Sequence, residues 1–461
     1  MKPIILNLDD RERKFIYEQL YEALREQILD GSIEPDEKLP SLRSLARDLG
    51  ISVTAVDQAY DQLTVEGYII SRPKSGYFAK HVNRGAAGSA GQTGSRNGRE
   101  TEERAEDTFI HDPSCFDFVK WKKCLNEVLN YHADRLLYES DPQGEHELRE
   151  QISEYILRSR GVDASPDRIV IGAGTQQMTS HLARILRKMG ISLVSIEEPG
   201  YLSVRSMLRD AGFQINRIPV KEDGIDVGML PGNIQSAVYV SPSNQFPTGA
   251  VMTAGRRYEL LRWAGENGSV VIEDDYDSEL RYFGRPVPAL KSLDKEDSVA
   301  YLGSFSSTLF PAVKISYMVL PERMAEIYLK IKTEYTQTCS KTEQLTLALF
   351  MKKGYYYTGI RRLRSLNSRK LEKTVDAMER HLGDRVSVQN TRSGMSVTLR
   401  MKAGETRTAA ELAECAAAIG LDMDPLSAVT GQDTSALTYY YSQIPLELID
   451  EKIKELGELW R

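Results

Sequence analysis

Cysteine is scarce in this 461-residue chain, and the four that occur lie far apart, at Cys115, Cys124, Cys339 and Cys415. No two of them have the CxxC spacing of a zinc site, and so few thiols cannot build the disulfide framework of a small secreted domain. We therefore expect neither a structural metal nor disulfide bonds. Such cysteine usage is typical of a reducing compartment, so we expect a cytoplasmic protein.

Long apolar runs are missing too. No stretch approaches the ~18 uninterrupted apolar residues of a membrane-spanning helix, and the N-terminal residues MKPIILNLDDRERK become charged by Asp9, which argues against a signal peptide. A positive net charge is also absent, because 59 basic and 66 acidic side chains give −7. Any binding to lipid or nucleic acid must therefore come from a local patch.

What is present is an ordinary globular composition, with 41% apolar and 27% charged residues, interrupted by one segment that cannot pack. Residues 81–107 are rich in Gly, Ala, Ser, Asn and charge, and Val82 is their only sizeable apolar side chain. Burial cannot offset the ordering entropy of such a segment, so we predict a flexible linker. The chain then divides into an N-terminal module, residues 1–80, and a C-terminal module, residues 108–461.

Three helices and a hairpin are predicted in the N-terminal module. Apolar residues recur at helical spacing over 15–29. Serine and glycine caps then bound two short helices, over 42–49 and 53–66. The apolar runs 68–70 and 77–78 flank a turn, which predicts a β-hairpin. Two short helices joined by a tight turn and followed by a hairpin form a winged helix-turn-helix.

This module resembles the winged helix-turn-helix of the GntR superfamily. The matching strings are KLPS (38–41), LGIS (49–52), AYDQL (59–63), EGYI (66–69) and SRPKSGYF (71–78). The resemblance implies that the second short helix enters the DNA major groove, while the helix before it and the wing hold phosphates and the minor groove.

The resemblance also implies the residues that would contact double-stranded DNA. They are Arg43, Ser52, Thr54 and Lys74, with Gly76 allowing the wing backbone to approach the duplex. Val53 and Ala55 depart from the Arg and Thr that family members often carry there, so the base contacts themselves stay open.

The charge of the module is modest for DNA binding. Residues 1–80 hold 11 basic and 14 acidic side chains, a net charge of −3, whereas residues 38–80 have a net charge of +2. The acidic excess lies in the first helix, which would face away from DNA. The small positive balance implies that two copies must bind together. A winged helix that docks on another protein remains an alternative.

In the C-terminal module, short apolar runs alternate with helical segments. Runs at 168–172, 193–196, 237–241, 270–273 and 299–302 are predicted strands. This alternation predicts an α/β domain with a mostly parallel sheet covered on both faces. Ligands of such sheets lie beyond the carboxyl ends of the strands, and a small-residue turn that opens a helix there favours a phosphate.

Together these segments resemble a fold-type I aminotransferase domain, which binds pyridoxal 5′-phosphate (PLP) and carries a smaller α+β domain. The matching strings are LYESDPQGEHELREQISEYILRSRGV (137–162), EEPGY (197–201), SPSNQFPTGA (241–250), EDDYDSELRYFGRPVPALKSLD (273–294) and GSFSSTLFP (303–311). Joined to a GntR winged helix, the chain resembles the MocR/GabR-type transcriptional regulators over nearly its whole length.

The resemblance implies roles at the PLP ring for four residues. Asp274 would pair with the pyridine nitrogen, and Tyr276 would hydrogen-bond the ring hydroxyl. Asn244 lies in the segment beside that hydroxyl, and Tyr201 would stack on the ring. Without the resemblance, Asp274 and Tyr276 could be strand-end caps and Tyr201 a core residue.

The resemblance further implies a phosphate site. Gly174, Thr175 and Gln176 would form a cup at the start of a helix. Tyr138 would reach the phosphate held by a neighbouring subunit.

Three positions depart from the family. Ser307 stands where the family has the lysine that holds PLP through a Schiff base, which a hydroxyl cannot form. Lys314 replaces an Arg that grips the phosphate with a planar fork. No Arg lies between Arg407 and Arg461, where the family holds an amino acid's carboxylate. We interpret these changes as a natural loss of transaminase chemistry, because an engineered serine would explain only the first.

The resulting hypothesis is a homodimeric transcriptional regulator, not an enzyme, that binds operator DNA and senses a small-molecule effector. PLP held non-covalently, or another anionic ligand in the same pocket, stays open. Covalent attachment of PLP is not expected, since Lys314 lies on the phosphate side and is a poor substitute for the missing lysine. The alternatives are a working aminotransferase and an architectural DNA binder whose C-terminal domain only dimerises.

Overall fold

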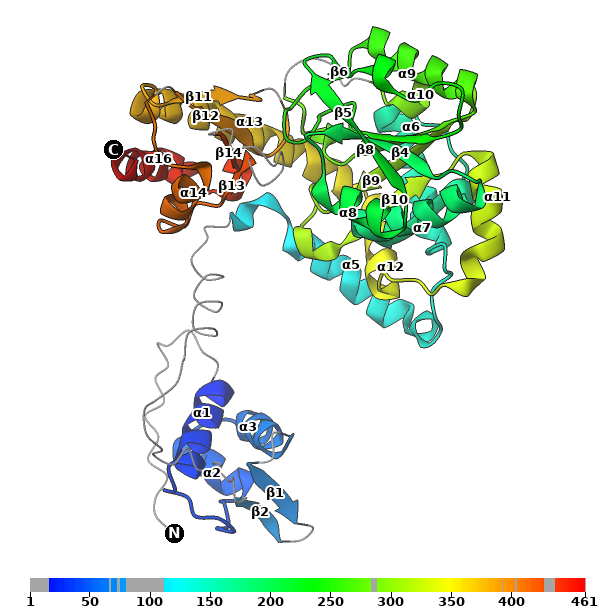
Figure 1. Cartoon of the computed structure of the whole chain (residues 1–461). Helices are drawn as coiled ribbons and strands as arrows, with labels where there is room; N and C mark the ends of the chain where they lie inside the picture. Colours follow the sequence, from blue (N-terminus) through cyan, green and yellow to red (C-terminus); the bar gives the residue numbers. More distant parts are fainter. Residues whose placement is uncertain are drawn as a thin grey trace, which may run out of the picture. The chain divides into compact units, whose positions relative to one another are not determined.

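The computed structural model describes residues 16–65, 68–72, 75–79, 112–282, 288–391, 393–402, 404–426 and 436–460. These residues fall into two compact units, one ending at residue 79 and the other starting at residue 112 (Figure 1). The predicted linker, residues 81–107, and the predicted DNA contact Lys74 lie outside the described residues. Within the described ranges, every helix is too short or too polar to cross a membrane.

The first unit is a winged helix-turn-helix. Its elements are α1 (Ile16–Leu29), α2 (Leu42–Leu49), α3 (Val53–Val65) and the antiparallel hairpin of β1 (Ile69–Arg72) and β2 (Gly76–Ala79). The predicted caps are confirmed for α2, because the Ser41 hydroxyl accepts the Ser44 N–H at 3.2 Å and Gly50 adopts a left-handed conformation with φ of 67°. Ser52 caps α3 in the same way, accepting the Ala55 N–H at 3.2 Å.

Tyr60 of α3 connects the parts of this unit. Its side chain is fully buried, and its hydroxyl donates to the Pro40 carbonyl at 3.0 Å. Its ring meets the edge of Tyr77 in the hairpin, with 4.9 Å between ring centroids. Since Leu24 and Leu63 are also fully buried in the same core, α1, α3 and the hairpin share one hydrophobic interior.

The second unit is built on an eight-stranded sheet with the order β3-β10-β9-β8-β7-β4-β5-β6 (Figure 1). The strands are β3 (Ile169–Ala173), β4 (Leu193–Glu198), β5 (Gln214–Lys221), β6 (Gly224–Ile225), β7 (Ala237–Val240), β8 (Val270–Asp275), β9 (Val299–Ser304) and β10 (Ile315–Val319). The five neighbours from β9 to β5 are parallel, whereas β10 is antiparallel to both of its neighbours and β6 is antiparallel to β5. The predicted mostly parallel sheet is therefore confirmed.

Helices cover both faces of this sheet, as alternate residues of each strand require. In β10, Ile315 and Tyr317 face one core, while Met318 faces the other. The Met318 side packs against α7 (Gly174–Lys188), α8 (Leu202–Asp210) and α11 (Glu322–Ile331). The opposite face packs against α5 (Phe118–Tyr131), α6 (His146–Arg160), α9 (Ala254–Asn267), α10 (Leu290–Leu293) and α12 (Lys341–Lys352).

A smaller α+β domain follows the long helix α13 (Tyr355–Leu382). Its antiparallel sheet has the order β11-β12-β14-β13, formed by β11 (Val386–Gln389), β12 (Val397–Met401), β13 (Met423–Pro425) and β14 (Ala436–Tyr439). The sheet packs on α14 (Ala409–Ala417), α16 (Ile449–Leu459) and the C-terminal part of α13 around one separate core. This confirms the predicted second domain.

Arg257 of α9 holds the segment after β7 in place. Its side chain is 1% exposed, yet it faces no carboxylate at bonding distance in the described part of the chain. Its guanidinium instead donates to three carbonyl oxygens, those of Met252 at 3.0 Å and of Pro242 and Pro288 at 2.8 Å. One side chain thus satisfies three backbone groups that water does not reach.

We expect Arg257→Met to lower the free energy of unfolding by about 3 kcal/mol or more, because it leaves these buried carbonyls without donors. Urea denaturation followed by circular dichroism measures the change. Arg262→Met, which alters an exposed arginine of the same helix, should stay within about 0.5 kcal/mol. Equal effects of the two substitutions would contradict the role given to Arg257.

Candidate ligand site in the second unit

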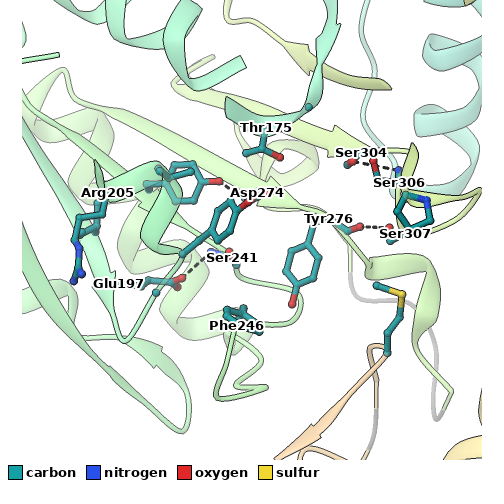
Figure 2. Close-up of a pocket in the computed structure, with 18 of the residues that line it drawn as sticks. Thr175, Glu197, Arg205, Ser241, Phe246, Asp274, Tyr276, Ser304, Ser306 and Ser307 are labelled. Carbon is teal, nitrogen blue, oxygen red and sulfur yellow. Dashed lines mark hydrogen bonds between the residues drawn. The ribbon is translucent and has the colours of Figure 1, made fainter. Parts of the chain in front are cut away.

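A cavity of about 440 Å³ lies beyond the carboxyl ends of the parallel strands (Figure 2). Most of the predicted ligand residues line it together. They are Gly174, Thr175, Tyr201, Asp274, Tyr276, Ser307 and Lys314. Gln176, Asn244 and Tyr138 do not line it, so the structure gathers seven of the ten predicted residues.

Asp274 is a buried carboxyl at the end of β8. The Tyr239 hydroxyl of neighbouring β7 donates to its Oδ2. Burial raises the pKa of Asp274 to about 6, although the bond from Tyr239 opposes the rise. A buried carboxyl that faces a cavity with one neutral donor suits a ligand with a protonated nitrogen.

Asn244 supports the cavity from behind rather than lining it. Its side-chain amide donates to the Tyr276 hydroxyl at 3.4 Å and to Asp277 at 2.7 Å. Within the same segment, Phe246 lines the cavity instead. Asn244 therefore holds Tyr276 in position, and the wall itself is aromatic at this point (Figure 2).

The opposite side of the cavity is rich in hydrogen-bond donors. The helix α7 begins at Gly174, and its N-cap residue, Ala173, has no side chain that could accept from the first N–H groups of the helix. Ser304 accepts from the Ser316 hydroxyl at 3.1 Å and from the Ser306 N–H at 3.3 Å, so its own proton remains to be donated. An anion at this end would meet the positive end of the α7 dipole. Lys314, exposed at the margin, adds a positive charge.

Ser307 lines the cavity beside these serines. Its hydroxyl donates to the Tyr276 carbonyl oxygen at 2.6 Å, as Figure 2 shows. Among the described residues that line the cavity, Lys314 and Arg205 are the cationic ones. Arg205 is paired with Glu198 at 3.3 Å.

Glu197 lines the cavity, although no role was predicted for it from the sequence. It is 5% exposed, and its Oε2 accepts the Ser241 N–H at 3.2 Å and the Gln245 amide at 3.3 Å. Burial raises its pKa to about 8, against the effect of those two bonds. Its position in the string EEPGY at the end of β4 was the available signal, since strand ends meet at the ligand site.

The smaller domain closes part of the cavity. Met395 and Tyr440 line it from this domain, and the Tyr440 hydroxyl donates to Asp424 at 2.7 Å. This side of the cavity is largely apolar and aromatic.

The remaining predicted residues are on surfaces. Tyr138 is 74% exposed, so its predicted contact with a neighbouring subunit stays a prediction. In the first unit, Arg43, Ser52, Thr54 and Gly76 are all exposed, with Ser52 also capping α3. Gly76 has φ of 100°, a conformation that favours glycine at the tip of the wing.

Comparison with known families matches both units. Residues 16–78 match the description "Bacterial regulatory proteins, gntR family", and residues 115–419 match "Aminotransferase class I and II".

Relatives match over most of the chain, and one matches over nearly all of it. YdeL of Bacillus subtilis, an HTH-type transcriptional regulator, is 37% identical over 97% of both chains. The regulatory protein MocR of Rhizobium meliloti is 33% identical over 84% of this chain and 81% of its own. PdxR of Corynebacterium glutamicum, an HTH-type pyridoxine biosynthesis transcriptional regulator, is 30% identical over 79% of this chain and 78% of its own.

Solved structures share the fold of the second unit. An archaeal alanine:glyoxylate aminotransferase superposes with a TM-score of 0.69 at 22% identity, covering 78% of this chain and 94% of that one. A kynurenine aminotransferase from Pyrococcus horikoshii superposes with a TM-score of 0.67 at 24% identity, covering 80% and 95%. At this identity the likeness shows the fold alone.

The buried carboxyl of Glu197 predicts a pH-dependent stability. Its pKa is higher in the folded than in the unfolded chain, so the folded state holds a proton that the unfolded state loses as the pH rises from about 4.5 to about 8. Glu197 therefore destabilises the fold increasingly over this window. Glu197→Gln should raise the melting temperature by several degrees at pH 8 and by much less at pH 5, measured by differential scanning calorimetry.

Glu198→Gln is the matched control, because the neighbouring carboxylate already faces Arg205. It should lower or preserve the melting temperature at pH 8. A Glu197→Gln protein with the same gain at both pH values would contradict the assignment.

Proposed function

The chain belongs to the MocR-type transcriptional regulators, and from this premise we propose that it is a dimeric DNA-binding regulator whose aminotransferase-like domain binds a small phosphorylated ligand without transaminase activity. The observation that carries the proposal is Ser307. A folded cavity retains its ring-side carboxyl and its phosphate-side donors, but the wall position of the reactive amine holds a hydroxyl.

The residues present fit PLP held non-covalently. Asp274 would receive the pyridine nitrogen, and Tyr276, supported by Asn244, would lie beside the ring hydroxyl. The first turn of α7 and the free proton of Ser304 would hold the phosphate. Such a site would keep the residues with which an aminotransferase binds its cofactor but would lack the lysine that reacts with it.

The residues do not fit transamination. In that reaction PLP acts as an electron sink, while a lysine amine attaches it to the protein and moves the proton. The Ser307 hydroxyl is short and already donates to the Tyr276 carbonyl. Lys314 is the one lysine among the described residues that line the cavity. It directly follows the 3-10 turn Pro311–Val313, on the side proposed for the phosphate and away from the position of Ser307.

An exposed apolar surface supports dimerisation through the second unit. Phe118, Val119, Leu129, Tyr131, Leu137 and Tyr138 are each at least 46% exposed. These six large side chains fall within 21 residues of α5 and the segment after it, where solvent exposure would be costly. A second copy covering this surface would also bring Tyr138 to an interface, as its predicted role requires.

A chain of contacts runs from the cavity to Asp112, the first described residue of the second unit. Residues 80–111 join the first unit to Asp112, and Asp112 pairs with the fully buried ammonium of Lys370 at 2.6 Å. The same ammonium donates to the Ser442 carbonyl at 2.7 Å. Ser442 lies two residues after Tyr440, which lines the cavity. A ligand that shifts Tyr440 would thereby move the point where the chain leaves for the DNA-binding unit.

DNA binding is tested at Arg43, an exposed residue of α2. We expect the native protein to shift a duplex from its own upstream region in a gel, and Arg43→Gln to weaken binding about tenfold or more, since a hydrogen bond to a charged group such as phosphate contributes about 1.5–3 kcal/mol. Arg323→Gln, the same charge change on the exposed face of α11, should leave the affinity unchanged. No binding by the folded native dimer at low salt would refute the proposal.

The series of contacts from Tyr440 through Ser442 and Lys370 to Asp112, which we call the relay, is tested at Lys370. We expect Lys370→Met to retain ligand binding but to lose the ligand-induced change in DNA affinity, measured by fluorescence anisotropy with and without saturating PLP. Lys373→Met is the control, because Lys373 of the same helix donates to the Leu446 carbonyl at 2.9 Å and does not contact Asp112. A full ligand response in Lys370→Met would exclude this relay.

A further inference from the structure

The direction of one hydrogen bond limits what Ser307 can offer a ligand. A serine hydroxyl has one proton, and that of Ser307 is donated to the Tyr276 carbonyl at 2.6 Å. Ser307 lines the cavity, and the lone pairs of its oxygen are still available to accept a hydrogen bond. Towards a ligand it therefore acts as a hydrogen-bond acceptor and not as a donor.

Ser304, on the strand β9 that leads to Ser307, has the opposite polarity. It accepts two hydrogen bonds, from Ser316 and from the Ser306 N–H, and keeps its proton for the cavity. The two serines thus divide the wall into a donor, suited to an anion, and an acceptor, suited to a cation or another donor group.

The wall of the cavity also holds a carboxyl that forms no ion pair within the described residues, that of the buried Asp274. Glu197 adds little negative charge at neutral pH, because burial raises its pKa to about 8. The guanidinium of Arg205 forms an ion pair with Glu198. The other cation among the described cavity residues is therefore Lys314, at the side proposed for the phosphate. The family's lysine would have supplied one further positive charge at the position of Ser307, and this chain lacks it.

We propose that the cavity selects the 4′-amine form of the ligand, of the pyridoxamine 5′-phosphate class, over the 4′-aldehyde form. The inference rests on the proposed function and names the ligand of that site. The residue at the Ser307 position is the one that the family uses towards the 4′ carbon. An ammonium there donates to the Ser307 oxygen and replaces the missing positive charge. An aldehyde oxygen is an acceptor, so it gains nothing from Ser307 and finds no amine to bind covalently.

Equilibrium binding to the full-length protein tests the selection. Isothermal titration in an amine-free buffer compares pyridoxamine 5′-phosphate with PLP. We expect the amine to bind at least about tenfold more tightly, as one additional charge-assisted hydrogen bond would provide. Borohydride reduction and peptide mass mapping correct the PLP titration for aldehyde attached to surface lysines. Pyridoxamine without its phosphate should bind far more weakly than its phosphate ester.

Two alanine variants separate the roles of the serines. Ser307→Ala removes the acceptor but leaves the space, so it should weaken the amine about tenfold and leave PLP affinity unchanged. Ser306→Ala, its neighbour in the cavity wall, should affect both compounds by the same factor. Thermal melting verifies that each variant is folded. Ser307→Lys should reverse the preference, and borohydride reduction should then leave PLP permanently attached at that residue.

The outcomes distinguish this inference from the proposed function. Equal affinities, or tighter PLP binding by the native protein, overturn the selection but leave a PLP-binding regulator. An unchanged preference in Ser307→Ala overturns the role of the serine oxygen. Failure of both phosphates to bind a folded native protein overturns the proposed ligand class and this inference with it.

Discussion

Three consecutive carboxyls at the end of β8 constrain the architecture of the second unit. Glu273, Asp274 and Asp275 are all buried, and a buried carboxyl without a donor is costly. Each has its own partner from a different part of the chain. The partners are the Leu290 and Lys291 N–H groups, the Tyr239 hydroxyl and the Arg160 guanidinium, respectively. The sheet, α6 and α10 are therefore held in register by the need to satisfy one strand end.

The middle carboxyl is the one that faces the cavity. Glu273 and Asp275 both point to the other face of the sheet, towards α10 and α6. Removing one partner of the buried Arg160–Asp275 ion pair, which is 2.7 Å long, would cost about 3–5 kcal/mol. The rigid surroundings leave Asp274 with a neutral donor only. The scaffold thus holds the predicted ring-binding carboxyl in place independently of the residue at position 307, so under the proposed function binding would outlast the loss of the reactive amine.

Local signals in the sequence predicted much of the fold. The caps at Ser41 and Gly50 and the hairpin after α3 could be predicted from the sequence, because they depend on residues that are neighbours along the chain. The strands β5 and β10 were not predicted, for two reasons. β5 is partly exposed near the margin of the sheet, and its sequence QINRIPVK has no apolar run. β10 is a buried apolar run, but only a 3-10 turn separates it from β9 and the two strands pair antiparallel, so the alternation of strands with helices does not indicate it.

The amino-acid sequence by itself determined that the chain joins a winged helix to an aminotransferase-like domain, and it led to the prediction that Ser307 stands at the position of the family's lysine. These are matters of residue identity and order. Only the tertiary structure decided that Glu197 lines the cavity, that Asn244 lies behind Tyr276, and that Tyr440 closes the site from the smaller domain. Such facts depend on which way a side chain turns and on contacts between residues that are far apart in the sequence. Packing and hydrogen-bond direction set them, and no local pattern encodes either.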